Sequence, residues 1–295
     1  LDQYLQRLQK FGHGTDLVYG TYKSKIYKNH RPQIGLAVHN FHDSRRILPP
    51  SRICDHKGTW LVLIMPYMEQ QPLYDRWDIM TCFYCQPREV RETVVPEYTC
   101  PSRARDELTV KCVPDGGHGG HSGEGDENGN EFWGAVTDYA AATGLKGRVG
   151  QDGIHHEGAL IYGKVTTHAL VIPTWTSNTK LSSIIDGTSS TFLAGEWTYK
   201  RAQSVSAYNG DHNPGTYAGP PPDTPDPNDD KWESFPVYPI ARDRNGPCFG
   251  SDHPGVCQFV FCDGSVHAIS VETDTEILGS LVTREGEEVM PGEGF

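Results

Sequence analysis

The sequence has no long hydrophobic run. A bilayer span needs about 20 mostly apolar residues, and the strongest run in the 295-residue chain, Trp60 to Met65, is far shorter. We therefore expect no membrane span in this chain. The first residues also lack the apolar core of a secretory signal peptide, so we interpret the sequence as a mature, already processed form.

Basic charge is scarce, and the common catalytic motifs are missing. Lys and Arg total 26 against 38 Asp and Glu, which gives a formal net charge of −12. Such a chain repels phosphate backbones, so nucleic-acid binding is not expected. The sequence contains no G-x-S-x-G, H-E-x-x-H, Walker or Rossmann pattern. We therefore predict a protein that is not an enzyme and binds no nucleotide.

Glycine and proline are plentiful, at 32 and 21 residues. These residues favour turns, so loops should outweigh long helices. Two stretches are predicted as long loop insertions. Residues 114–134 are crowded with Gly, His and acidic residues, and residues 213–230 contain Pro-Pro-Pro and repeated Asp-Pro or Thr-Pro steps. Loops of this length inside one domain are either functional or inserted.

The chain has eight cysteines, an even number that favours disulfides and an oxidising compartment. Zinc binding is the weaker interpretation, because Cys82-Phe-Tyr-Cys85 is a single C-x-x-C without a second one. No His follows Cys85, so haem attachment there is excluded. Buried thiols in a reducing compartment remain an alternative. We expect at least two disulfides, and proximity in the sequence suggests three pairs: Cys82–Cys85, Cys100–Cys112, and Cys248 with Cys257 or Cys262.

Hydrophobic periodicity predicts two helices. Pro32 suits a first helical turn, and it is followed at helical spacing by Ile34, Ala37, Val38 and Phe41. Pro49-Pro50 ends this element. Residues 272–281 are predicted as a terminal helix with an apolar face. The short run from Trp60 to Met65 fits either a buried strand or a buried helix.

The clearest local signal is a β-hairpin near the end of the chain. Alternating residues from Cys257 to Cys262 are followed by Asp263-Gly264 and then by Ser265 to Ile269. An Asp-Gly pair between two alternating runs is a strong hairpin signature, because the turn needs residues with positive φ.

Seven motifs, in order along the chain, fit one protein family. They are Gln33-Ile-Gly-Leu-Ala-Val-His-Asn-Phe-His-Asp43 with Leu48-Pro-Pro50, Trp60-Leu-Val-Leu-Ile-Met-Pro-Tyr-Met-Glu-Gln70, Val95-Pro-Glu-Tyr-Thr-Cys-Pro-Ser-Arg103, Thr137-Asp-Tyr-Ala140, Ile185-Asp-Gly-Thr-Ser-Ser-Thr191 with Gly195-Glu196, Phe249-Gly-Ser-Asp-His-Pro-Gly255, and Phe261-Cys-Asp-Gly-Ser-Val266. His253 and Asp263-Gly264 are separated by nine residues. The chain resembles the bacterial family of prepilin-like, pseudopilin-related secreted proteins with a C-terminal H-X9-DG motif. Its domain has no established function and is sometimes labelled solute-binding.

The resemblance implies an exported protein with a pilin-like α+β fold, in which an N-terminal helix packs on an antiparallel β-sheet. It assigns residues 29–295 to a single pseudopilin-like domain with the two loop insertions. Family members usually begin with a long apolar prepilin helix, whereas residues 1–28 are polar and interrupted by glycines. This segment is expected to stand in place of that helix. Either the helix was lost, or the chain assembles through other surfaces.

His253 and Asp263 invite comparison with an acid–base pair. A strand over residues 256–262 would span about 23 Å at roughly 3.3 Å per residue, which places the two side chains at opposite ends. We therefore predict a structural role for the motif, with Asp263-Gly264 forming the turn and His253 serving as a hydrogen-bonding residue. Catalytic residues are not assigned.

A calcium site is predicted in the acidic loop. Asp126, Asn128 and Asn130 present oxygen ligands at alternate positions, as in the first half of a calcium-binding loop. The EF-hand pattern itself fails, because it needs Gly and Glu where Glu131 and Thr137 stand. A looser site formed by the first three residues, with Asp138 as a weaker candidate, remains an alternative to a solvated polar loop.

Two functional classes follow. The leading hypothesis is a non-enzymatic extracellular or cell-surface structural subunit of a filament or pilus-like assembly, which would contact itself or other extracellular subunits. The alternative is a secreted module that binds calcium, a glycan or another solute, favoured by the acidic loops and by 14 Tyr and 6 Trp residues.

Overall fold

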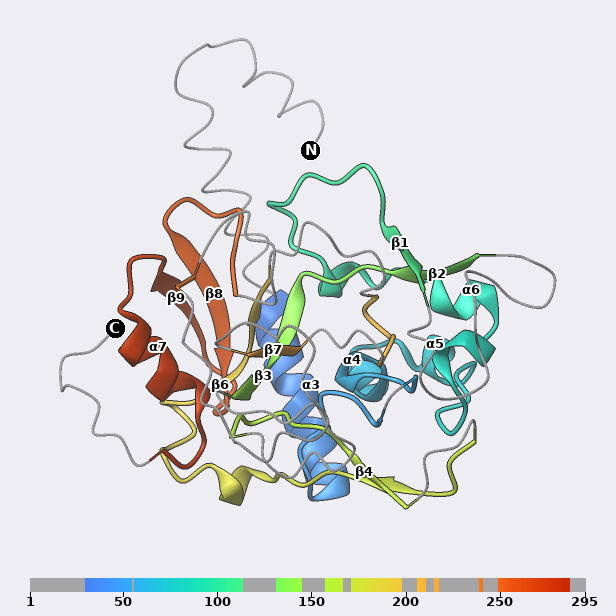
Figure 1. Ribbon diagram of the computed structural model, residues 1–295, viewed down its shortest axis with the longest axis horizontal. Helices are drawn as coiled ribbons and strands as arrows, with labels where there is room; N and C mark the ends of the chain where they lie inside the picture. Colours follow the sequence, from blue (N-terminus) through green and yellow to red (C-terminus); the bar gives the residue numbers. More distant parts are fainter. Residues whose placement is uncertain are drawn as a thin grey trace, which may run out of the picture.

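Figure 1 shows a computed structural model of the protein, which describes residues 30–54, 56–113, 131–144, 157–166, 171–197, 206–210, 215–217, 239–240 and 249–286. Short helices and mainly antiparallel strands form an α+β fold, as predicted. The segment 1–28 lies outside these ranges.

The labels of Figure 1 are used throughout. The α-helices are α3 (His30–Arg45), α4 (Trp60–Ile64), α5 (Gln71–Tyr74), α6 (Arg88–Arg91) and α7 (Thr275–Val282), and the 3-10 helices are η1 (Met65–Tyr67), η2 (Phe83–Cys85), η3 (Pro96–Tyr98) and η4 (Leu181–Ser183). The strands are β1 (Thr109–Cys112), β2 (Phe132–Ala135), β3 (Tyr139–Gly144), β4 (Lys164–Val165), β5 (Trp175–Thr176), β6 (Phe192–Glu196), β7 (Gly215–Tyr217), β8 (Val256–Phe261) and β9 (Val266–Ser270).

The largest sheet has five strands in the order β7-β3-β6-β8-β9. Only β7 runs parallel to its neighbour, and the other pairs are antiparallel. Tyr139 of β3 lies opposite Glu196 of β6, and Gly195 lies opposite Phe259 of β8. This register brings the start of β3, the end of β6 and the start of β8 to the same edge of the sheet. The candidate site described below lies at this edge.

Helix α3 confirms the helix predicted from Pro32, although it begins two residues earlier. Its apolar positions are buried: Ile34, Ala37 and Val38 have no exposed surface, and Phe41 is 2% exposed. After the helix, Arg46 adopts a positive φ of 61°. A left-handed residue just past a helix redirects the chain and stops further helical hydrogen bonding.

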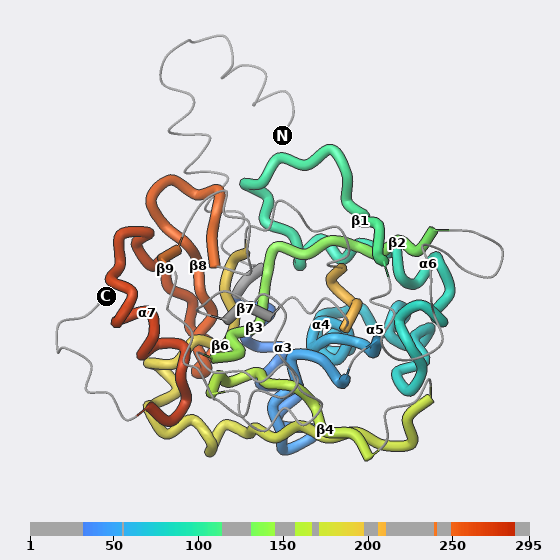
Figure 2. Tube along the Cα trace, viewed as in Figure 1, coloured from blue at the N-terminus to red at the C-terminus, as the bar shows by residue number. Residues whose placement is uncertain are grey.

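Helices cover both faces of the sheet. Phe259 and Phe261 of β8 pack in one apolar cluster with Leu278 and Leu281 of α7. Val260, between them, belongs to the main core together with Ile34 of α3. Figures 1 and 2 show α3 and α7 on opposite sides of β6 and β8. Because side chains alternate along a strand, successive residues of β8 pack against helices from opposite ends of the chain.

The predicted hairpin is present as β8 and β9, with Asp263-Gly264 in the turn. Asp263 Oδ1 accepts a hydrogen bond from the backbone N–H of Ser265 at 2.8 Å, and Gly264 has φ +84°. A Cβ added at Gly35 of α3 would lie 3.1 Å from Gly264 Cα. Two glycines therefore permit the close approach of the hairpin turn to the helix.

Three sequence predictions need correction or completion. The end of the predicted loop 114–134 forms strand β2, which pairs with β1, while residues 114–130 lie outside the described ranges. The predicted loop 213–230 includes β7, because the edge of β3 offers unpaired backbone groups to it. The run from Trp60 is helical, and all five residues of α4 are buried.

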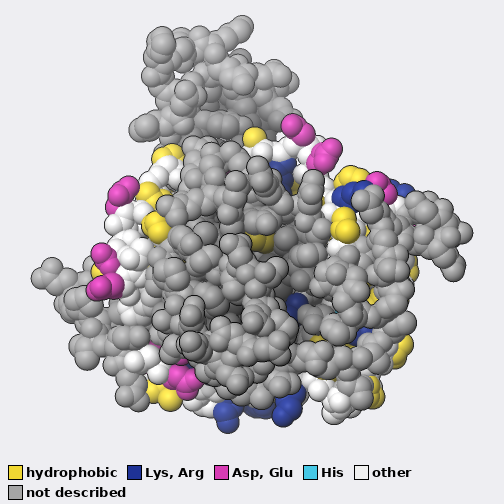
Figure 3. Space-filling model, viewed as in Figure 1, with side chains coloured by type: hydrophobic (Ala, Val, Ile, Leu, Met, Phe, Trp, Pro, Cys, Tyr) yellow, Lys and Arg dark blue, Asp and Glu magenta, His cyan; other side chains and the backbone are white. Residues whose placement is uncertain are grey.

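None of the helices in the described part of the chain is long and apolar enough to cross a membrane. On the face shown in Figure 3, acidic side chains lie along the edge near β9 and α7, where Glu272, Asp274 and Glu276 are exposed. These exposed carboxylates agree with the net charge of −12, and the same view shows a group of Lys and Arg side chains at its lower edge.

The turn glycine provides a test of hairpin docking. Gly264→Ala forces a left-handed conformation on a residue with a Cβ and places that carbon 3.3 Å from His39 of α3, so we expect unfolding to become easier by about 2 kcal/mol. Gly255→Ala is the matched control, since Gly255 has φ +71° with no atom within 4 Å of the added carbon, and it should cost about 1 kcal/mol. Urea denaturation measures both, and equal costs would show that contact with α3 contributes nothing.

Candidate functional site

Four of the quoted motifs meet at one edge of the five-stranded sheet. The loop after η3 supplies Cys100, the end of β6 supplies Glu196, and the loop before β8 supplies His253. Asp138, immediately before β3, lies behind Cys100. These residues are far apart in the sequence, so long-range strand pairing brings them together.

The loop carrying Cys100 is fixed to the core by Tyr98. The Tyr98 side chain is fully buried, and its hydroxyl donates to the carbonyl of Leu61 at 2.7 Å. Its own carbonyl accepts hydrogen bonds from the backbone N–H of Asp138 at 2.8 Å and from the Thr137 hydroxyl at 3.1 Å. Cys100, two residues later, is thereby held beside the start of β3.

Asp138 orients the Cys100 loop through its buried carboxylate. Oδ2 accepts a hydrogen bond from the backbone N–H of Cys100 at 2.7 Å. Oδ1 pairs with Arg103 at 2.5 Å and also with Arg105. Burial lowers the pKa of Arg105 to about 10, helped by the neighbouring Arg103 charge. Arg103 also lies 3.7 Å from Asp252, so one guanidinium links the Cys100 loop to the loop that carries His253.

Glu196 is 1% exposed, and each of its two oxygens has a separate set of partners. Oε2 accepts hydrogen bonds from the Ser251 hydroxyl at 2.8 Å and from the backbone N–H of Gln258 at 3.0 Å. Oε1 lies 3.1 Å from Nε2 of His253. The first set fixes the orientation of the carboxylate, which directs the second oxygen at the imidazole.

His253 lies between the thiol and the carboxylate. Its Nε2 is 3.5 Å from Sγ of Cys100 and 3.1 Å from Oε1 of Glu196. The pKa of His253 is raised to about 9. The largest cause is the hydrogen bond with Cys100, and the next is the hydrogen bond with Glu196. At neutral pH in the absence of a metal, the imidazole is therefore protonated and forms an ion pair with the buried carboxylate.

The arrangement differs from a nucleophilic triad in one respect. In a triad, one ring nitrogen contacts the nucleophile and the other contacts the orienting carboxylate. Here the thiol and the carboxylate both approach the same nitrogen, Nε2. One N–H cannot donate well to both acceptors at once. The sulfur, nitrogen and oxygen atoms lie within 4.8 Å of one another, which is the arrangement expected around a shared cation.

The structure separates the two ends of the H-X9-DG motif. Asp263 and Gly264 form the hairpin turn, as predicted. His253 lies beyond the other end of β8 and is a hydrogen-bonding residue, also as predicted, but its partners Cys100 and Glu196 were not foreseen. The available signal was that both partners belong to motifs of the same family.

Only one of the four predicted calcium ligands, Asp138, lies among the described residues. Asp126, Asn128 and Asn130 lie outside the described residues, so that site stays a prediction. The oxygens of Asp138 accept hydrogen bonds from Arg103, Arg105 and the backbone N–H of Cys100. Two guanidinium groups neutralise this carboxylate and disfavour an additional cation on it.

Of the predicted disulfides, Cys82–Cys85 is confirmed, with Cα atoms 5.2 Å apart. The proposed Cys100–Cys112 pair is wrong in this structure, because Cys100 faces His253 and Cys112 donates to the Val110 carbonyl. Cys248 lies outside the described residues. Both of its suggested partners, Cys257 and Cys262, are buried thiols, and burial raises the pKa of Cys262 strongly.

The family model SBP_bac_10, described as a protein of unknown function (DUF1559), matches residues 28–276. The chain belongs to the DUF1559 family. The match spans all four motifs that form the cluster around His253, so this site lies within the family domain. No curated protein and no solved structure matches this DUF1559 chain.

The His253 ion pair predicts a pH-dependent stability of the metal-free protein. The pKa is raised from 6.5 to about 9 on folding, so this contribution is complete below pH 6.5 and is lost as the pH rises through 9. With a chelator present, the difference in unfolding free energy between wild type and His253→Gln should shrink by at most about 3 kcal/mol across that interval. His267→Gln, at an exposed position on β9, is the control. A difference that stays constant with pH would contradict the ion pair.

Proposed function

We propose that the protein is a binding module for a divalent transition-metal ion of the zinc class. Its ligands are Cys100, Glu196 and His253. The observation that carries the proposal is the approach of Sγ and Oε1 to a single imidazole nitrogen.

The distances support a tetrahedral ion. Ligand atoms about 2.0–2.3 Å from zinc lie roughly 3.3–3.6 Å from one another at tetrahedral angles. The separations at His253 Nε2 are 3.5 Å to sulfur and 3.1 Å to oxygen. The sulfur and the carboxylate oxygen lie within 4.8 Å of each other, so binding would require side-chain movements that bring these two atoms to tetrahedral spacing.

The donor chemistry selects the metal class. Zinc accepts thiolate, imidazole and carboxylate ligands together, whereas calcium prefers oxygen alone. Three protein ligands leave one tetrahedral position for water or for a group of a bound solute. This open position connects the metal site to the solute-binding alternative predicted from the sequence.

The surrounding residues support the ligands in the way that outer contacts of metal sites do. Ser251 and the Gln258 N–H hold one oxygen of Glu196, which leaves the other for the site. Asp138 holds the backbone of Cys100. Such contacts orient ligands before the ion arrives, which reduces the ordering required on binding.

Zinc titration by calorimetry, with a competing chelator, tests the proposal. We expect about one zinc per chain at this site with release of protons, because the thiolate and imidazole must be deprotonated. Cys100→Ser and His253→Gln should each weaken binding by at least about tenfold. Calcium should not compete.

Two control variants keep this test specific. Cys112→Ser changes a buried thiol on β1, and His267→Gln changes an exposed imidazole on β9. Both should bind zinc as the wild type does. Cobalt provides a second readout, since the thiolate-to-cobalt absorption should disappear in Cys100→Ser. Unchanged zinc affinity in correctly folded Cys100→Ser and His253→Gln would overturn the proposal.

The prepilin relationship, export, and the role of a filament subunit stay predictions from the motifs, as does the absence of enzymatic activity. The metal proposal does not depend on them. Electron microscopy of the native purified material tests the filament hypothesis directly. Monodisperse monomers at high concentration, with and without zinc, would oppose it.

A further inference from the structure

The Cys82–Cys85 disulfide has one buried and one exposed partner. Cys82 has no exposed surface, whereas Cys85 is exposed. The bridge encloses only two residues, Phe83 and Tyr84, in the turn η2. A disulfide restrains the unfolded chain less when its loop is shorter, so this bridge is poorly placed to act mainly as a structural staple.

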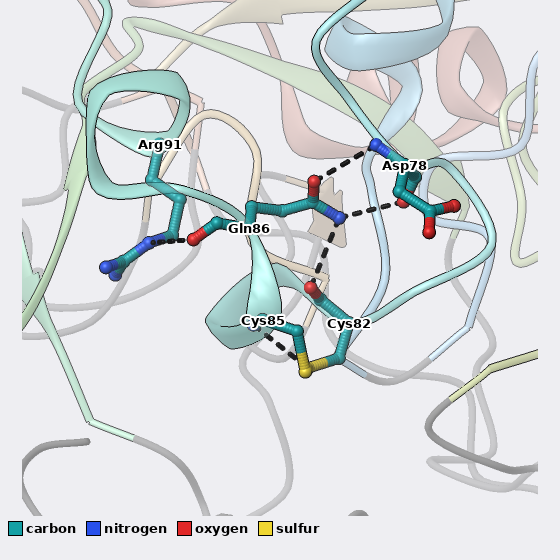
Figure 4. Close-up of a disulfide and its surroundings, with 5 residues drawn as sticks. All are labelled: Asp78, Cys82, Cys85, Gln86 and Arg91. Carbon is teal, nitrogen blue, oxygen red and sulfur yellow. Dashed lines mark hydrogen bonds between the residues drawn. A yellow bond between two sulfur atoms is a disulfide. The ribbon is translucent and has the colours of Figure 1, made fainter. Parts of the chain in front are cut away.

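Contacts other than the disulfide hold the same turn. In Figure 4 the Gln86 side chain lies between Asp78 and Cys82. Its Nε2 donates to the carbonyls of Asp78 at 2.8 Å and Cys82 at 3.3 Å, and its Oε1 accepts from the Asp78 N–H at 3.1 Å. Arg91 donates to the Gln86 carbonyl at 3.2 Å. These bonds remain possible when the sulfur–sulfur bond is broken, so the turn should persist after reduction.

The buried sulfur of Cys82 also accepts a hydrogen bond, which would stabilise a negative charge on it. The backbone N–H of Cys85 donates to Sγ of Cys82 at 3.1 Å. Hydrogen bonds to a charged acceptor are stronger than those to a neutral one. This bond would therefore stabilise a thiolate on Cys82, which makes Cys82 the better leaving group in an exchange reaction.

We propose that Cys82 and Cys85 form a redox-active pair that exchanges with an external dithiol through Cys85. A thiolate of the dithiol attacks the exposed sulfur of Cys85, forming a mixed disulfide and releasing Cys82 as a thiolate. The second thiolate of the dithiol then attacks the other dithiol sulfur, which is bonded to Cys85 in the mixed disulfide, and Cys85 is released as a thiolate. The protein gains two electrons and two protons, and the dithiol becomes a disulfide.

This proposal is independent of the metal site, which uses Cys100 and none of the residues around η2. The two sites are separated experimentally by working with a chelator present. A Cys100→Ser background removes the metal-site thiol, and peptide mass spectrometry distinguishes labelling at Cys82 and Cys85 from labelling at the other cysteines.

The test is reduction of the folded full chain by dithiothreitol, followed by alkylation and peptide mass spectrometry. We expect reduction without denaturant, labelling of Cys85 in preference to Cys82, and a reduced protein that keeps its circular dichroism spectrum and a cooperative melt. Reoxidation should restore the original disulfide. A disulfide that resists reduction until denaturant is added, or a chain that unfolds on reduction, would overturn the proposal.

Single-cysteine variants identify the attacked sulfur. Cys82→Ser leaves the exposed Cys85 and should form a mixed disulfide with a chromogenic aromatic disulfide in the folded state. Cys85→Ser leaves the buried Cys82 and should react at least about tenfold more slowly, since exchange rates depend on access. The reverse order would contradict attack at Cys85, and equal spectra of the two variants confirm that both are folded.

Discussion

The buried carboxylate of Glu196 constrains the whole edge of the sheet. A buried anion without partners would be strongly destabilising, so the chain must supply donors to it. They come from Ser251, from the backbone of Gln258 at the start of β8, and from His253. The order and register of β6 and β8 therefore have an electrostatic cause as well as an apolar one. The neighbouring Asp138 carboxylate imposes a similar requirement, which two arginines satisfy.

These two carboxylates explain why motifs scattered along the sequence meet. The backbone N–H of Trp197 donates to the Asp138 carbonyl at 2.9 Å, which ties the residue after Glu196 to the residue before β3. Asp138 then fixes the Cys100 loop through its backbone N–H, and Glu196 fixes the His253 loop through Ser251 and His253. The sulfur of Cys100 and the imidazole of His253 thus come from separate loops and the carboxylate of Glu196 from the end of β6, each fixed by its own set of hydrogen bonds. A rigid frame of this kind is what a selective binding site requires.

Local signals in the sequence predicted the local elements. The spacing of Ile34, Ala37 and Val38 indicated α3, and the Asp263-Gly264 pair indicated the β8–β9 hairpin, because both depend on nearby residues. The same signals left the Trp60 run ambiguous, since a short, fully apolar segment has no periodicity to interpret. Strand β7 was missed inside a proline-rich stretch, because its pairing depends on β3 and not on its own composition.

The end of the hairpin has a consequence for how the protein is made. The Gly264 turn packs against Gly35, near the opposite end of the described chain. Strand β8 pairs with β6, the central strand of the five-stranded sheet. Contacts between such distant residues form slowly, because a long loop must close first. During synthesis, α3 can pack early against α4 and η1, which follow it closely in the sequence, but its contact with β8 must wait until residues 256–261 have been made. The cluster around His253 also stays incomplete until then, so the nascent chain carries Cys100 without His253 beside it. A partly folded chain of this kind exposes apolar surface and unpaired strand edges, which makes it prone to aggregation.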